Sequence, residues 1–336
     1  MADAFTLVLD RRDMTVTMEG RALCVQRSGE AKRHVPLGLI DNVVVYGRPM
    51  VACDVWRALA RKGIAAVLLP ARGAGEAAWL GAGFSGTSQL RYLQYRAYSE
   101  FSARVNTARR VLELKLNAQS TLIEYVRGSA LFDVEDGEKA LTDAGRAVEA
   151  AKANIASTSS LAALMGHEGA AARAWFGCLE RILPERWRFV GRNRRPPVDP
   201  VNALLSLTYT MAGLELLNAV QATGLDPSLG FLHDIKPGRN ALMLDLLEIL
   251  RPAADLIVLE MLEETLQPEH FATNQHAGCR LTKAGRGLYY RSWSEKRMAW
   301  PDLHRRHNGD DDCLVHRRSL SSCSRRAVRE LCRVFV

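Results

Sequence analysis

The spacing of apolar residues along this chain changes once, at the Gly/Ser-rich stretch 81–88. Before it, short apolar and alternating runs recur, which is typical of strands. After it, apolar residues recur every three or four positions for most of the chain, which is typical of helices. The sequence therefore predicts an α+β protein, with a small N-terminal β-rich domain at 1–84 and a larger all-α domain at 85–300.

Within the first part, the expected strands lie at 5–9, within 15–26 and 34–47, and at 64–70. The segment 15–26 alternates around Glu19 and Gly20, as a hairpin would. Residues 54–63 carry helical spacing that ends at Gly63. We expect a small mixed sheet with one helix packed against it.

Within the second part, residues 89–127 form one long helical pattern, 131–155 form another, and further helices follow to about residue 270. The last segment, 301–336, is rich in Arg, Ser, His and Cys and shows little periodicity before residue 327. We expect it to be a divergent, poorly ordered tail.

Composition limits the classes of function. With 336 residues and 48% apolar residues, the chain can bury two sizeable cores. The formal net charge of +8 favours a polyanionic partner such as nucleic acid, although ordinary solubility charge explains it equally well. We find no run of 18 or more apolar residues and no signal-peptide pattern at the start, so we expect a cytoplasmic protein without a membrane span.

The cysteines indicate reduced thiols. There are seven, with no C-x-x-C pair and irregular spacing. This pattern supports neither a disulfide framework nor a zinc site.

A carboxylate lies within an apolar stripe of the expected helix that follows Ser159 and Ser160, either of which can cap it. The stripe consists of Leu161, Leu164, Met165, Ala172, Trp175, Leu179 and Ile182. Glu168 falls inside this stripe, and a carboxylate that faces a core needs a charged or donating partner. A buried ion pair with Arg173 or Arg181 explains Glu168 without any function.

Two more carboxylates lie on a helix expected to start near Ala241, with Asn240 as its cap. Asp245 and Glu248 are the only charged residues in its run ALMLDLLEIL, and their spacing places them on one face. Two like charges on a buried face call for a cation between them, unless the face meets solvent. His233, on the preceding loop, adds an imidazole, and oxygen ligands with one imidazole suit Mg²⁺ or Mn²⁺.

Basic residues flank these carboxylates. The loop between the two helices carries a cluster of arginines beside two prolines, and a second basic loop follows His233. The arginine cluster is a candidate phosphate contact, and a solvated loop is an equal alternative. Basic groups on the second loop, beside carboxylates and an imidazole, suit phosphodiester chemistry. The candidate DNA-binding residues are Arg192, Arg194, Arg195, Lys236, Arg239 and Tyr209.

Three segments, in this order along the chain, resemble the CRISPR adaptation integrase and endonuclease, the Cas-one family. They are MGHEGAAARAWF, NRRPPVDPVNALLSLTY and GFLHDIKPGRNALMLDLLEILRP. The β-rich start and the helix opening QLRYLQYRAY are also similar to that family, so the resemblance covers roughly residues 5–297. It implies an N-terminal β domain, used for homodimerisation, and a helical catalytic domain.

The resemblance also implies a site and a reaction. The family's metal ligands match Glu168, His233 and Glu248, and Asp245 matches a supporting acidic position. The implied reaction is attack of a spacer DNA 3′-hydroxyl on a CRISPR repeat phosphodiester, assisted by Mg²⁺ or Mn²⁺. The implied partners are double-stranded DNA and a small ferredoxin-like adaptation protein, the Cas-two family.

One departure from the family concerns the C-terminal end. Such proteins continue past LTKAGRGLYYRSW with another helix, whereas here an Arg/Ser/Cys-rich segment follows, by natural divergence or by a shifted reading frame. Three other functions stay open. They are a transposon-type integrase of the same superfamily, a non-catalytic DNA-binding subunit of an adaptation complex, and an unrelated helical metallohydrolase.

Overall fold

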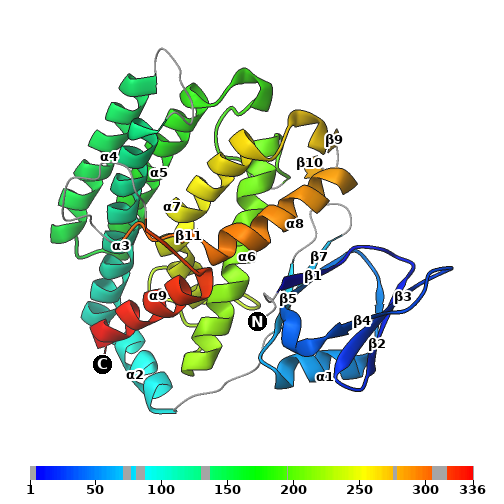
Figure 1. Cartoon of the computed structure of the whole chain (residues 1–336). Helices are drawn as coiled ribbons and strands as arrows, with labels where there is room; N and C mark the ends of the chain where they lie inside the picture. Colours follow the sequence, from blue (N-terminus) through cyan, green and yellow to red (C-terminus); the bar gives the residue numbers. More distant parts are fainter. Residues whose placement is uncertain are drawn as a thin grey trace.

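The computed structural model describes residues 5–70, 77–80, 88–129, 137–194, 196–274, 278–304 and 316–335. A strand-rich N-terminal part lies beside a larger helical part, as the sequence predicts (Figure 1). The expected domain boundary at residue 84 lies outside the described residues, so both domain limits stay a prediction.

The N-terminal strands form two sheets, not the single mixed sheet that we expected. The first has the order β1 (Phe5–Leu9), β5 (Ile40–Tyr46), β7 (Ala65–Leu69) and β8 (Ala78–Leu80). The second has the order β4 (Arg33–Pro36), β3 (Ala22–Arg27), β2 (Met14–Glu19) and β6 (Met50–Val51). Strands β2 and β3 form the antiparallel hairpin predicted around Glu19 and Gly20, and Gly20 has φ +63°. Helix α1 (Cys53–Arg61) follows β6.

The first sheet belongs to two hydrophobic cores because successive strand residues point to opposite faces. On β5, Val43 and Val45 pack in the N-terminal core with α1, whereas Val44 packs in the helical core. A buried polar link joins the same two parts. Glu215 accepts hydrogen bonds from Asn42 on β5 at 2.8 Å and from Arg297 at 2.7 Å. The first sheet therefore packs against the helical part on one face and against the rest of the N-terminal part on the other.

The helical part consists of α2 (Ser88–Ser99), α3 (Phe101–Gly128), α4 (Gly137–Ser157), α5 (Leu161–Ile182), α6 (Pro200–Thr223), α7 (Ala241–Glu264), α8 (Lys283–Met298) and α9 (Leu320–Phe335). Short elements complete the described chain: η1 (Leu37–Leu39), η2 (Glu185–Trp187), η3 (Pro268–His270), β9 (Phe271–Asn274), β10 (Gly278–Leu281), β11 (Trp300–Pro301) and β12 (Arg317–Arg318). The single helix expected over 89–127 is two helices, because Glu100 has extended backbone angles and interrupts it.

Local signals set several helix ends. The Ser160 hydroxyl caps α5 by accepting from the Ala163 amide, and Asp199 caps α6 with Pro200 at the first helical position. Asn240 occupies the N-cap of α7 without a side-chain hydrogen bond, so that expected cap is wrong in detail. Helix α6 is long and apolar enough to cross a membrane, yet 72% of the relevant window is buried inside the molecule, as in a core helix.

The end of the chain differs from the poorly ordered tail that we expected. Strands β11 and β12 pair, and α9 packs against α6 and α3. The buried apolar residues of α9 recur at helical spacing: Leu320, Cys323, Ala327, Val328 and Leu331. The arginines masked this period, because Arg325, Arg326 and Arg329 alternate with the apolar positions. Residues 305–315 lie outside the described residues.

Candidate functional site

A buried lysine joins two of the three predicted ligand residues. Lys115 extends from α3, and its ammonium donates a hydrogen bond to Glu168 on α5 and another, 2.7 Å long, to Glu248 on α7. Lys115 and Glu248 are buried, whereas the Glu168 side chain is 20% exposed. The partner of Glu168 is thus Lys115, not the Arg173 or Arg181 that we considered.

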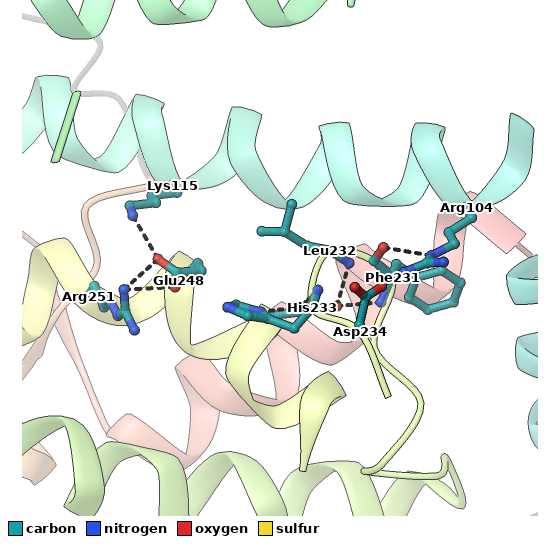
Figure 2. A network of polar contacts seen from close by, with 9 residues as sticks. Arg104, Lys115, Phe231, Leu232, His233, Asp234, Glu248 and Arg251 are labelled. Carbon is teal, nitrogen blue, oxygen red and sulfur yellow. Dashed lines mark hydrogen bonds and ion pairs between the residues drawn. The ribbon is translucent and has the colours of Figure 1, made fainter. Parts of the chain in front are cut away.

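Glu248 is held as a carboxylate by two cations (Figure 2). Arg251, one turn further along α7, lies 2.7 Å from the Glu248 Oε1 atom. Burial acts to raise the pKa of Glu248, but Arg251 and Lys115 outweigh it and lower that pKa to about 2. Glu248 is therefore ionised at neutral pH, and its face does not meet solvent.

Asp245, the other carboxylate on this face, anchors the loop that carries His233. Its oxygens accept hydrogen bonds from the backbone amides of Phe231, Leu232 and His233, at 2.5, 3.0 and 3.0 Å. The His233 ring donates a further bond through Nδ1, at 2.7 Å. Asp245 is completely buried and its acceptor positions are occupied, so it orients His233 instead of offering an oxygen to an ion.

The same loop is fixed at two other points. Arg104 from α3 donates to the Phe231 carbonyl at 3.1 Å and to the Asp234 carboxylate at 2.7 Å. At Gly230, an added Cβ would lie 2.7 Å from the carbonyl carbon of Ala241, so only glycine lets the loop approach α7 this closely. These contacts restrict where the imidazole can lie.

His233 lies next to Glu248. Figure 2 shows its ring on the side of the loop that faces Glu248, and His233 contributes to the lowered pKa of that carboxyl group. Because Nδ1 donates to Asp245, Nε2 is the ring nitrogen that remains able to bind a ligand.

A buried polar network lies behind the site. The Asp255 carboxylate on α7 accepts hydrogen bonds from Trp175 Nε1 on α5, at 2.9 Å, and from the Tyr209 hydroxyl on α6. Burial raises the pKa of Asp255 to about 6, against the opposing effect of these two donors. Tyr209 is itself buried, which argues against its predicted contact with DNA.

The predicted basic residues divide into two groups. Arg192 is partly buried and bonded to Asn202 at 2.7 Å and to Ser206 at 3.2 Å, and burial lowers its pKa. It therefore supports the loop instead of reaching outward. Arg194 and Lys236 are exposed and Arg239 is half-buried. Arg195 lies outside the described residues.

Three residues of the site were not predicted from the sequence: Lys115, Arg251 and Arg104. A signal existed for Lys115, since it interrupts an apolar stripe of α3 formed by Val111, Leu112 and Leu122. The argument used for Glu168 applies to it equally. Arg251 and Arg104 look like ordinary surface residues in the sequence, because their partners are known only from the packing.

The residues present fit a hard divalent cation. Two carboxylates converge on the ammonium of Lys115, so a positive charge is already favourable at that position. One of these carboxylates is ionised at neutral pH, and an imidazole nitrogen is available beside it. Carboxylate oxygens with one imidazole are a donor set that Mg²⁺ and Mn²⁺ accept.

The chain is similar to known proteins over most of its length. Residues 7–295 match the family model described as CRISPR associated protein Cas1. The CRISPR-associated endonuclease Cas1 1 of Thermodesulfovibrio yellowstonii is 31% identical over 303 residues, which cover 88% of this chain and 93% of that protein.

Solved structures share the fold. A casposase bound to integration product has a TM-score of 0.79 at 20% identity, covering 98% of this chain and 90% of the other. A chain of a Cas6–RT–Cas1–Cas2 complex has a TM-score of 0.74 at 19% identity, covering 99% of this chain and 35% of the other. The family match and the curated relative together establish that the chain belongs to the Cas1 family of CRISPR-associated proteins.

Proposed function

We propose that this chain is a metal-dependent DNA endonuclease and integrase that inserts spacer DNA into a CRISPR array. The reaction is attack of a DNA 3′-hydroxyl on a repeat phosphodiester. Membership of the Cas1 family, whose relatives are named endonucleases, supports the nuclease activity. One observation carries the site: Glu168 and Glu248, from different helices, converge on one buried cationic position beside His233.

In this proposal Glu168, His233 and Glu248 hold Mg²⁺ or Mn²⁺. When bound, the ion supplies a more acidic hydroxyl and neutralises charge at the phosphate. Asp245 keeps the His233 ring in the tautomer with Nδ1–H and thus presents Nε2 to the site. Burial would favour protonation of Glu248, and the positive charge of Arg251 keeps it ionised.

Double-stranded DNA is the proposed substrate. The net charge of +8 and the exposed Arg194 and Lys236 support it. The proposed assembly is a homodimer together with a Cas2-type partner in the cytoplasm, and the likeness to a chain of a Cas1–Cas2-containing complex supports that partner.

The second candidate function is that of a transposon-type integrase. The structural similarity to a casposase bound to integration product supports this candidate. The chemistry would be the same and the target would differ. A CRISPR repeat array and a Cas2-type gene beside the coding sequence would support the first function, and terminal inverted repeats would support the second. A non-catalytic subunit is disfavoured because the three proposed ligands are all retained.

The test uses purified protein, a Cas2-type partner and a plasmid that carries a repeat array. Glu168, His233 and Glu248 are each changed to Ala, and strand transfer, nicking, DNA affinity and thermal stability are measured. We expect each variant to lose both reactions while it keeps its fold and its affinity for DNA. Arg173→Ala, an exposed change on the same helix as Glu168, serves as the control. Full manganese-dependent activity of His233→Ala, or loss of activity only through unfolding, would contradict the proposed site.

A further inference from the structure

A second group of metal-type donors lies on the outer sheet of the N-terminal part, away from the site described above. Glu19 on β2, Cys24 on β3 and His34 on β4 place one oxygen, one sulfur and one ring nitrogen within 4.8 Å of one another. The strand register explains why they meet. Cys24 and His34 are directly opposite, and Glu19 is opposite Ala22, which precedes Cys24 by two residues. All three side chains therefore lie on one face of the sheet.

This face is the one turned away from the N-terminal core. The alternate residues Val16 and Leu23 are buried in that core, so Cys24 points to the opposite side. Cys24 is nevertheless only 2% exposed, whereas Glu19 and His34 are exposed. A thiol on the outer face is thus enclosed beneath a carboxylate and an imidazole.

The Glu19 carboxylate above the thiol already binds two partners. His34 Nε2 lies 2.6 Å from one Glu19 oxygen, and the Lys32 ammonium lies 2.8 Å from the other. These two partners lower the pKa of Glu19 to about 2, so its carboxylate is ionised at neutral pH. Lys32 is half exposed and can turn to solvent at little cost.

We propose that Glu19, Cys24 and His34 bind a divalent transition-metal ion of the zinc class. One sulfur, one nitrogen and one oxygen donor on three adjacent strands suit this class, because thiolate and imidazole are the ligands that zinc prefers. The thiol proton leaves to solvent as the metal–sulfur bond forms. The His34 nitrogen that binds the ion gives up the hydrogen it now donates to Glu19, and in the neutral ring the other nitrogen carries the hydrogen instead. The Lys32 ammonium leaves the Glu19 oxygen. Three protein ligands leave one tetrahedral position for water.

The consequence is a cross-link over three strands. Strand β4 is at the edge of its sheet, and an ion bound by these residues would join it to the β2–β3 hairpin. The spacing of the cysteines gave no hint of this, because Cys24 is the only cysteine in the group and its co-ligands are brought in by strand pairing.

Cobalt(II) tests the proposal with a signal that the other site cannot give. A thiolate bound to Co²⁺ produces a charge-transfer absorption band, and the ligands proposed for the catalytic ion include no sulfur. The full-length protein is titrated with Co²⁺, and Zn²⁺ is then added as competitor. We expect one equivalent of Co²⁺ to produce the band and Zn²⁺ to abolish it.

Variants assign the ligands. Cys24→Ser should lose the band, and His34→Ala and Glu19→Gln should weaken Co²⁺ binding by at least about 10-fold, the loss caused even by removing an outer-shell partner. Lys32→Met should bind more tightly because it removes the competing ammonium. Cys53→Ser, at an exposed cysteine of the same part of the chain, should keep the band.

Two outcomes overturn the proposal. One is the absence of the band in the wild-type protein. The other is unchanged Co²⁺ affinity in both His34→Ala and Glu19→Gln, whose exposed positions make misfolding an inadequate explanation. Glu168→Ala should keep the band even where it loses strand transfer, so failure of this proposal is distinguishable from failure of the proposed function.

Discussion

At the scale of single residues, Lys115 is the link between helices that were predicted separately. Its ammonium is buried between two carboxylates, one of which Arg251 also contacts. Such a buried cation offsets the repulsion and desolvation of the carboxylates until another cation takes that place.

Lys115→Met should therefore destabilise the protein when no divalent ion is present. We expect a loss of about 3 kcal/mol, the lower end of the cost of breaking a buried pair, because Arg251 still contacts Glu248. Added Mn²⁺ should raise the melting temperature of the variant more than that of the wild type. Calorimetry with and without Mn²⁺ measures both effects, with Lys139→Met, at an exposed position on α4, as the surface control. Equal stability of variant and wild type in chelator would contradict this role.

Asp245 acts through His233 and through three backbone amides. Asp245→Asn keeps one oxygen for the amides but loses the anion that accepts from the His233 ring. We expect Mn²⁺ affinity to fall about 10- to 100-fold with the fold retained. Isothermal titration measures the affinity, and Asp143→Asn, an exposed change on α4 away from this loop, is the control. An unchanged affinity would show that the ring needs no such support.

At the scale of elements, Asp255 joins three helices, since its partners are on α5 and α6. Its pKa is raised from 3.8 to about 6, so the folded protein binds this proton more tightly than the unfolded chain. Stability contributed by the protonated form is therefore lost as pH rises from about 4 to about 6.

Asp255→Asn removes that titration. Over the same pH interval, the wild type should lose stability relative to the variant. Urea unfolding at several pH values from about 4 to 7 measures the difference in slope. Asp143→Asn, at an exposed position on α4, should leave the slope unchanged. Parallel stability curves for wild type and Asp255→Asn would refute this assignment.

Helix α9 is a further element whose contribution can be measured. Leu331 is buried where α9 packs against the other helices, so Leu331→Ala should cost about 2–5 kcal/mol. Val334→Ala, at an exposed position on the same helix, should cost far less. Denaturant unfolding compares the two, and equal small losses would mean that α9 is not part of the folded core.

At the scale of the whole molecule, the positive net charge predicts how DNA binding responds to salt. If the bound protein neutralises about six phosphates, its affinity for duplex DNA should fall roughly 10³-fold as the salt concentration rises from about 50 to 200 mM. Arg194→Ala combined with Lys236→Ala should reduce the salt slope by about 0.9 for each phosphate that the variant no longer neutralises. Fluorescence anisotropy measures the slopes, with Lys62→Ala on the N-terminal part as control. Salt-independent binding would exclude this surface as the DNA-binding face.

The sequence by itself determined the kind of most elements up to about residue 270 and identified residues that do not suit their surroundings. Period-two runs predicted the strands, period-3.6 runs predicted the helices, and carboxylates in apolar stripes identified Glu168 and Glu248. These properties depend on neighbours along the chain, so a local pattern is enough to reveal them. The resemblance of three ordered motifs then added the family.

Only the tertiary structure decided which charged side chains pair with one another. Lys115 contacts Glu168 and Glu248 across separations of 53 and 133 residues, and no local pattern encodes such a pairing. Packing also turned Asp245 toward the His233 loop and Glu248 toward Lys115, although both leave the same face of α7. Strand register likewise assembled Glu19, Cys24 and His34. The physical reason is the same each time: a buried polar group takes its partner from whatever element the apolar packing places beside it.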